Sequence, residues 1–141
     1  MPGTNPLYKA FETEGRVRPD DIDMFQHVHN SKYLDYVLAA RYDQMEHDYG
    51  MSMETFMEQG YGWVVKTAHI NFKRPLMLGD YFTVKTGIDD IDTRGCRVKF
   101  IITSKTTNKI SADGWFDFVM VDIKNGKSVL IPEEIMEQYM I

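Results

Sequence analysis

The chain has 141 residues, of which 43% are hydrophobic and 26% charged, proportions typical of one folded domain rather than a disordered chain. A net charge of −5 argues against nucleic acid as the main partner, and no run of about 20 apolar residues predicts a membrane span. Cys96 is the only cysteine, which excludes an internal disulfide and favours a reducing compartment such as the cytoplasm. We therefore expect a single domain over residues 1–141.

The first predicted element is a short strand over residues 11–17, followed by an irregular acidic stretch. From Ser31 the pattern becomes helical, because apolar side chains recur at helical spacing, namely Leu34, Val37, Leu38, Tyr42 and Met45. Asn30 or Ser31 is suited to cap the first turn of this helix, and Gly50 ends it. A shorter helix rich in methionine is predicted at about residues 52–59.

After Gly62 the hydrophobic pattern changes to a period of two, which is typical of strands. Four such runs, separated by turn residues, cover residues 64–72, 82–88, 96–102 and 112–120. Turns this short imply an antiparallel meander rather than crossover helices, and a last short helix opens at Pro132. We therefore predict an α+β domain in which a curled antiparallel sheet of about five strands wraps around one long helix.

The stretch richest in chemistry runs from Asp21 to Tyr33 and reads Asp-Ile-Asp-Met-Phe-Gln-His-Val-His-Asn-Ser-Lys-Tyr. It places two carboxylates and two histidines just before the start of the long helix. Free amides at a helix start are able to polarise a carbonyl, and a carboxylate a few residues upstream is able to act as nucleophile or as base for a water. This set suffices for acyl transfer to water. The same residues are also expected in a purely structural loop, in which aspartate and asparagine cap the helix and histidine packs against its neighbours. Residue types alone therefore leave both interpretations open.

This stretch resembles the Asp-x-Asp-x-x-x-His-Val-Asn-Asn-x-x-Tyr signature of hydroxybenzoyl-CoA-thioesterase-like hotdog proteins, in their acyl-CoA thioesterase branch. The matching positions are Asp21, Asp23, His27, Val28, Asn30 and Tyr33. The later segment Lys73-Arg74-Pro75-Leu76-x-x-Gly79-Asp80 is also similar to the family, and the resemblance spans nearly the whole chain. Two positions depart from the signature: His29 replaces the first asparagine, and Gln26 replaces a small residue that is often glycine.

The resemblance implies a single hotdog domain that hydrolyses an acyl-CoA or acyl-carrier-protein thioester to free acid and thiol, with a place in lipid metabolism. It assigns the catalytic carboxylate, as nucleophile or general base, to Asp23 and the amide that polarises the carbonyl to the region of Asn30. His27 either orients Asp23 or fills space. The resemblance implies a small-molecule acyl-CoA partner and assembly as a homodimer or homotetramer with the site between subunits. We expect no cofactor and no metal.

Substrate binding is expected at His29, Ser31 and Tyr33 beside the catalytic pair. Residues 66–109 carry nine Lys or Arg against four acidic residues, and within them the phosphates of a coenzyme suit Lys73, Arg74 and Arg97. Basic side chains that only protect strand edges explain the same charge pattern. The acyl group needs an apolar channel, and a methionine-rich group either lines it or packs in the core: Met51, Met53, Phe56 and Met57.

Three other functions compete with hydrolysis. A hotdog dehydratase or isomerase needs a different acid–base pair, and a non-catalytic acyl-binding domain accounts for the altered positions 26 and 29. Asp23, His27 and His29 are able to share one face and bind a metal, but the chain offers no clear further ligand. Cys96 is predicted to be a small buried hydrophobic residue of a strand rather than a nucleophile.

Overall fold

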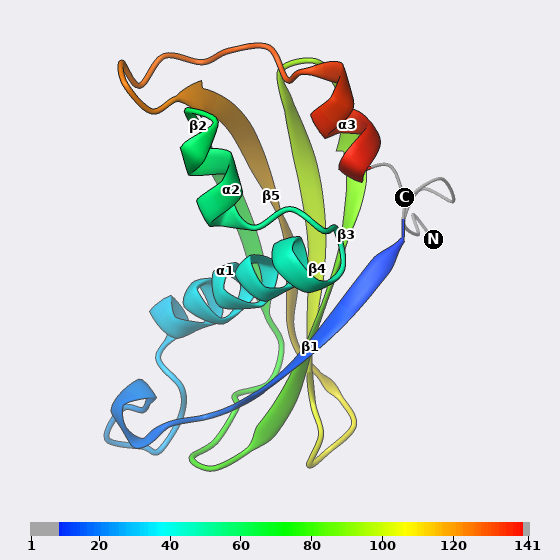
Figure 1. The fold of residues 1–141 in the computed structure, drawn as a ribbon. Helices are drawn as coiled ribbons and strands as arrows, with labels where there is room; N and C mark the ends of the chain where they lie inside the picture. Colours follow the sequence, from blue (N-terminus) through cyan, green and yellow to red (C-terminus); the bar gives the residue numbers. More distant parts are fainter. Residues whose placement is uncertain (1–8, 140–141) are drawn as a thin grey trace.

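The computed structural model describes residues 9–139, so the predicted domain of residues 1–141 is covered except for its two ends. Figure 1 shows a strongly curled sheet with the long helix α1 lying across its concave side. In chain order the elements are β1 (Ala10–Arg16), the 3-10 turn η1 (Pro19–Asp21), α1 (Asn30–His47), α2 (Met53–Glu58), β2 (Tyr61–Phe72), β3 (Tyr81–Ile91), β4 (Gly95–Ser104), β5 (Ile110–Asp122) and α3 (Glu133–Tyr139).

The five strands form one antiparallel sheet in the order β1-β3-β4-β5-β2, so β1 and β2 are its two edges. Register shifts at Val65/Thr67 and Ile88/Asp90 mark bulges, which increase twist and help a sheet to curl. The predicted α+β architecture, with about five strands around one helix, is confirmed. No helix within residues 9–139 is long and apolar enough to cross a membrane.

Helix α1 forms where the apolar spacing predicted it, and it packs on β1 and β3, while α2 packs on β2. Its polar Gln44 is fully buried and donates to Thr13 of β1 at 3.0 Å, while Thr86 of β3 donates to the Gln44 amide oxygen.

The predicted cap of α1 is wrong: the N-cap position is His29, one residue earlier, and no side chain caps the helix. Asn30 and Ser31 already lie inside the first turn, where their side chains cannot serve as the cap.

The core consists of two adjoining clusters along α1. The first packs the N-terminal half of α1, through Tyr33 and Val37, against the aromatic side chains of the sheet. The second surrounds the end of α1 and includes Phe56 of α2 and Tyr139 of α3. Cys96 is partly buried at the edge of this second cluster, as the strand pattern predicted.

Candidate active site

Asp23 is held in a tight turn that its own carboxylate closes. Oδ1 accepts hydrogen bonds from the backbone amides of Phe25 at 2.9 Å and His27 at 3.1 Å. The Asp23 amide donates to the His27 carbonyl at 2.8 Å, and its carbonyl accepts from the Gln26 amide at 3.0 Å. Gln26 has a φ of 65°, a left-handed conformation that favours glycine, which explains why the family signature often has a small residue here. The turn fixes one carboxylate oxygen and leaves the other without a hydrogen bond among the described residues.

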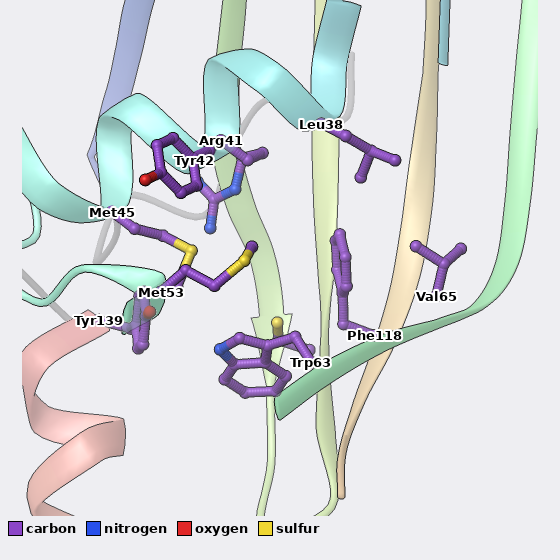
Figure 2. Close-up of a pocket in the computed structure, with 10 residues that line it drawn as sticks. Leu38, Arg41, Tyr42, Met45, Met53, Trp63, Val65, Phe118 and Tyr139 are labelled. Atoms are coloured by element: carbon purple, nitrogen blue, oxygen red, sulfur yellow. The ribbon is translucent and has the colours of Figure 1, made fainter. Parts of the chain in front are cut away.

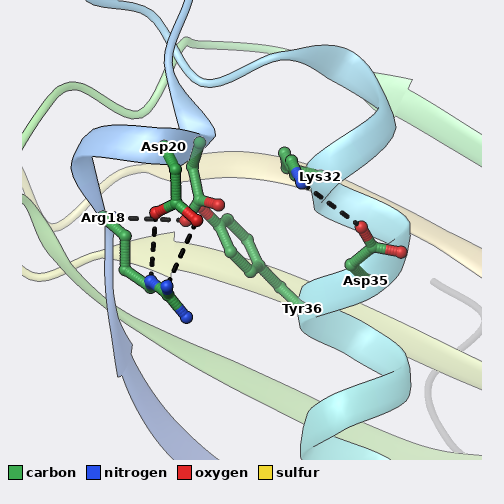
Figure 3. Close-up of polar contacts among 6 residues, drawn as sticks. Arg18, Asp20, Lys32, Asp35 and Tyr36 are labelled. Atoms are coloured by element: carbon green, nitrogen blue, oxygen red, sulfur yellow. Dashed lines mark hydrogen bonds and ion pairs between the residues drawn. The ribbon is translucent and has the colours of Figure 1, made fainter.

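Asp21 anchors the same loop to α1. Its buried carboxylate accepts from the Tyr36 hydroxyl of α1 at 2.6 Å and from the Arg18 amide at 3.2 Å. Figure 3 shows Tyr36 reaching from α1 toward the carboxylates beside η1, where Arg18 pairs with Asp20 at 3.1 Å. Burial and the bond to Asp21 raise the pKa of Tyr36, so its hydroxyl stays a donor. The first aspartate of the pair therefore positions the loop that carries the second.

Asp23 and the start of α1 border one open depression of about 700 Å³. The end of β2 and the segment after it form the opposite wall. The residues that line the depression are Asp23, His27, Val28, His29, Asn30, Ser31, Tyr33, Phe72, Lys73, Arg74 and Pro75. The structure thus brings together every predicted site residue except Arg97.

The amides of Asn30 and Ser31 lack an acceptor among the described residues, because the helix start has no side-chain cap. Such amides carry the positive end of the helix dipole and favour a negatively charged oxygen. Both residues line the depression that Asp23 borders. A carboxylate and free amides therefore face one solvent-accessible space.

His27 and Tyr33 support this arrangement through the backbone. His27 fixes Asp23 by its amide, and its ring makes no hydrogen bond within residues 9–139. Its backbone also bridges to Met77, which ties the Asp23 turn to the segment after β2. The buried Tyr33 hydroxyl accepts from the Leu76 amide at 2.9 Å and so holds that same segment against α1.

The three predicted phosphate ligands are placed differently. Lys73 pairs with Asp113 at 2.8 Å and Arg74 donates to the Ile110 carbonyl at 3.3 Å, both at the exposed rim of the depression. Arg97 lies on the convex face of β4, where its guanidinium pairs with Asp117 at 2.8 Å and stacks 3.9 Å from the Trp115 ring. Within one chain Arg97 does not line the depression, so its role in phosphate binding stays a prediction.

A second, largely apolar cavity of about 230 Å³ lies beside the C-terminal half of α1 (Figure 2). We name it the Arg41 pocket; its lining is Leu38, Arg41, Tyr42, Met45, Met53, Trp63, Val65, Cys96, Phe118 and Tyr139. Of the methionine-rich group predicted to line a channel, Met53 alone does so; Phe56 is in the core and Met57 is exposed. Burial raises the pKa of the Cys96 thiol to about 12, so this wall of the pocket stays uncharged.

Sequence patterns did not identify several lining residues. In the depression, Val28 and Pro75 belong to the two family-like segments, but no pattern assigns a site role to them or to Phe72, since apolar residues carry no chemical signal. In the Arg41 pocket, Arg41, Trp63 and Tyr139 belong to no recognisable sequence motif. Within residues 9–139, no group of three His, Cys, Asp or Glu side chains is arranged to hold a metal ion.

Comparison with known proteins gives consistent matches. The model of the thioesterase-like superfamily matches residues 17–139. The long-chain acyl-CoA thioesterase FadM of Escherichia coli (strain K12) is 28% identical over 127 residues, covering 90% of this chain and 95% of that protein. The structure of YbaW from Escherichia coli, described as a probable thioesterase, has 27% identity and a TM-score of 0.77, covering 90% of this chain and 94% of its own. The DHNA-CoA thioesterase of Staphylococcus aureus shares the fold, with a TM-score of 0.86 at 18% identity over 92% of this chain and 88% of its own.

Proposed function

Since the chain belongs to the thioesterase-like superfamily, we propose that it hydrolyses an acyl-CoA thioester to a free acid and coenzyme A, with Asp23 as the catalytic carboxylate. The predicted family, the hotdog fold and the assignment as a thioester hydrolase are confirmed by the family match and by similarity to proteins named thioesterases. One observation carries the catalytic proposal: the Asp23 carboxylate and the uncapped amides of α1 border the same depression.

In the proposed reaction, the thioester carbonyl oxygen accepts hydrogen bonds from the amides of Asn30 and Ser31. These amides stabilise the negative charge that develops on the oxygen as the tetrahedral intermediate forms. Asp23 either attacks the carbonyl carbon or removes a proton from a water that attacks it. Hydroxylamine separates the two routes, because it traps an acylated Asp23 in the first route and finds none in the second.

The carrier is proposed to lie along the rim formed by Lys73 and Arg74. Both side chains are exposed, and their positive charge suits the phosphates of coenzyme A or of a carrier-protein arm. The Lys73 ammonium is already paired with Asp113, so a phosphate has to compete with that carboxylate. Arg74 bonds only to a backbone carbonyl among the described residues and is therefore the stronger candidate.

We also propose a homodimer, formed along the free edge of β2. This edge strand exposes apolar side chains, with Val64 45% and Phe72 48% accessible. A twin chain is able to satisfy the unpaired backbone groups of such an edge. Phe72 also lines the depression, so a neighbour along β2 would help to close the substrate site.

A panel of acyl-CoAs tests the reaction type. Purified protein is mixed with each compound, and free thiol and acyl products are measured separately. Release of thiol supports hydrolysis. Hydration or isomerisation of the acyl chain without thiol release would replace the proposal with a dehydratase or isomerase, and binding without turnover would replace it with an acyl-binding domain.

A further inference from the structure

We propose that the Arg41 pocket receives the far end of the acyl chain and that this end carries a carboxylate, so that the preferred substrates are ω-carboxyacyl thioesters. The inference rests on the proposed hydrolysis, because it names the substrate class of that same site. It is carried by two buried polar groups that face an otherwise apolar cavity, Arg41 and Tyr139.

The Arg41 guanidinium is buried without an acidic partner. The residue is 8% exposed, and no carboxylate within residues 9–139 lies at ion-pair distance from it. Nη1 donates to the neutral hydroxyls of Thr86 at 3.2 Å and Tyr49 at 3.4 Å, and no other guanidinium nitrogen has an acceptor in the described part of the chain. A buried charge is ordinarily paired, since removing it from water is costly. The guanidinium also lies over the Tyr49 ring, 5.1 Å from its centroid, so the pocket offers a positive charge that an aromatic ring and two hydroxyls contact but no carboxylate of the described residues pairs with.

Tyr139 of α3 adds a second polar group to the wall of the pocket. It is 3% exposed, and its hydroxyl is the one buried side-chain polar atom without a hydrogen bond among the described residues. Burial is the main cause that raises the pKa of Tyr139, so the hydroxyl keeps its proton as a donor. Figure 2 shows Arg41 pointing from α1 toward Met53 and Trp63, and the Tyr139 ring lies beside Trp63, with the two ring centroids 6.0 Å apart. A carboxylate would accept from both groups, whereas a methyl end would leave both unpaired.

The pocket lies at a suitable distance from the proposed catalytic site. Arg41 is eleven residues along α1 from Asn30, which corresponds to about 16 Å of helix. Leu38 of α1 and Val65 of β2 line the pocket, while Tyr33 of α1 and Phe72 of β2 line the depression. The same helix and the same strand therefore border both the depression and the Arg41 pocket.

The test compares two acyl-CoAs of equal chain length, one ending in a methyl group and one in a carboxylate. For the wild-type protein we expect kcat/KM to favour the carboxylate end by at least about tenfold, the effect of one charge-assisted hydrogen bond. Tyr139→Phe should reduce this preference several-fold, and Arg41→Met should abolish it. The matched controls Tyr81→Phe and Arg94→Met, which alter exposed side chains outside both sites, should keep the preference.

Binding of the same pair to Asp23→Asn, measured by calorimetry, provides a readout that needs no turnover. If neither compound is hydrolysed by wild type, the proposed reaction fails, and the calorimetric preference still decides the pocket proposal. Should Arg41→Met fail to fold, the Tyr139→Phe result decides instead. Equal or weaker binding of the carboxylate-ended compound, or a preference that survives in every folded pocket variant, would overturn the inference.

Discussion

Asp21 and Asp23 are separated by one residue, yet their carboxylates have different surroundings. Asp21 is buried and accepts from Tyr36 and Arg18, while Asp23 accepts from two amides of its own turn and borders the depression. The family resemblance singled out Asp23 as the catalytic carboxylate, and the structure places this residue on the depression that the start of α1 also borders. It did not reveal how Asp21 acts, because the Tyr36 partner lies 15 residues away in the chain and no local pattern links them.

Tyr36→Phe tests the anchoring role of Asp21. The change removes one hydrogen bond to a buried carboxylate, and we expect the free energy of unfolding to fall by about 1–3 kcal/mol in urea denaturation. The thioesterase kcat should fall as well, since the Asp23 loop loses its tie to α1. Tyr81→Phe, which removes an exposed hydroxyl, is the matched control and should stay within about 0.5 kcal/mol of wild type. A Tyr36→Phe protein as stable as this control would contradict the role.

The same residue predicts a pH dependence at alkaline pH. The pKa of Tyr36 is raised in the folded protein above its ordinary value of 10.0, so the folded state keeps a proton that the unfolded state loses. Stability contributed by this hydroxyl is therefore present below pH 10 and lost as the pH rises further. Unfolding curves should show the advantage of wild type over Tyr36→Phe shrinking above this pH. An advantage that grows there would contradict the assignment.

At the scale of elements, hydrophobic periodicity predicted α1 and the four strands β2 to β5, because each has one face against the core. Strand alternation also predicts the orientation of Arg97. This residue lies between Cys96 and Val98, which face inward, so its side chain faces outward. Hydrophobic periodicity could not predict the Arg41 pocket. Its walls come from α1, α2, α3 and three strands, and a cavity wall has the same apolar pattern as a packed core.

The turn that holds Asp23 allows a test of backbone strain. Gln26→Gly should raise the free energy of unfolding by up to about 1 kcal/mol, since glycine adopts the left-handed conformation without a Cβ penalty. Gln59→Gly is the control, because Gln59 has a φ of −81° and gains nothing from glycine. Equal effects of the two substitutions in thermal denaturation would argue against strain at position 26.

At the scale of the whole molecule, the depression of the single chain is open to solvent and includes Phe72 at the end of the edge strand β2, so the proposed dimer would cover part of it. Light scattering coupled to gel filtration should show at least a dimer for the wild type. Val64→Lys should shift it toward the monomer, because it places a charge on the exposed edge strand. Leu130→Lys, on an exposed loop, is the control and should leave the mass unchanged. A monomeric wild-type protein would refute the dimer.

The central claim is that the carboxylate at position 23 takes part in the cleavage of the thioester. The most direct measurement is the rate of thiol release from the best acyl-CoA of the panel by Asp23→Asn, with folding checked by circular dichroism and thermal denaturation. The account predicts that kcat/KM falls by at least about 10²-fold, while Asp20→Asn, a change at an exposed neighbour outside the depression, retains activity. A folded Asp23→Asn protein that hydrolyses the compound at the wild-type rate would contradict it.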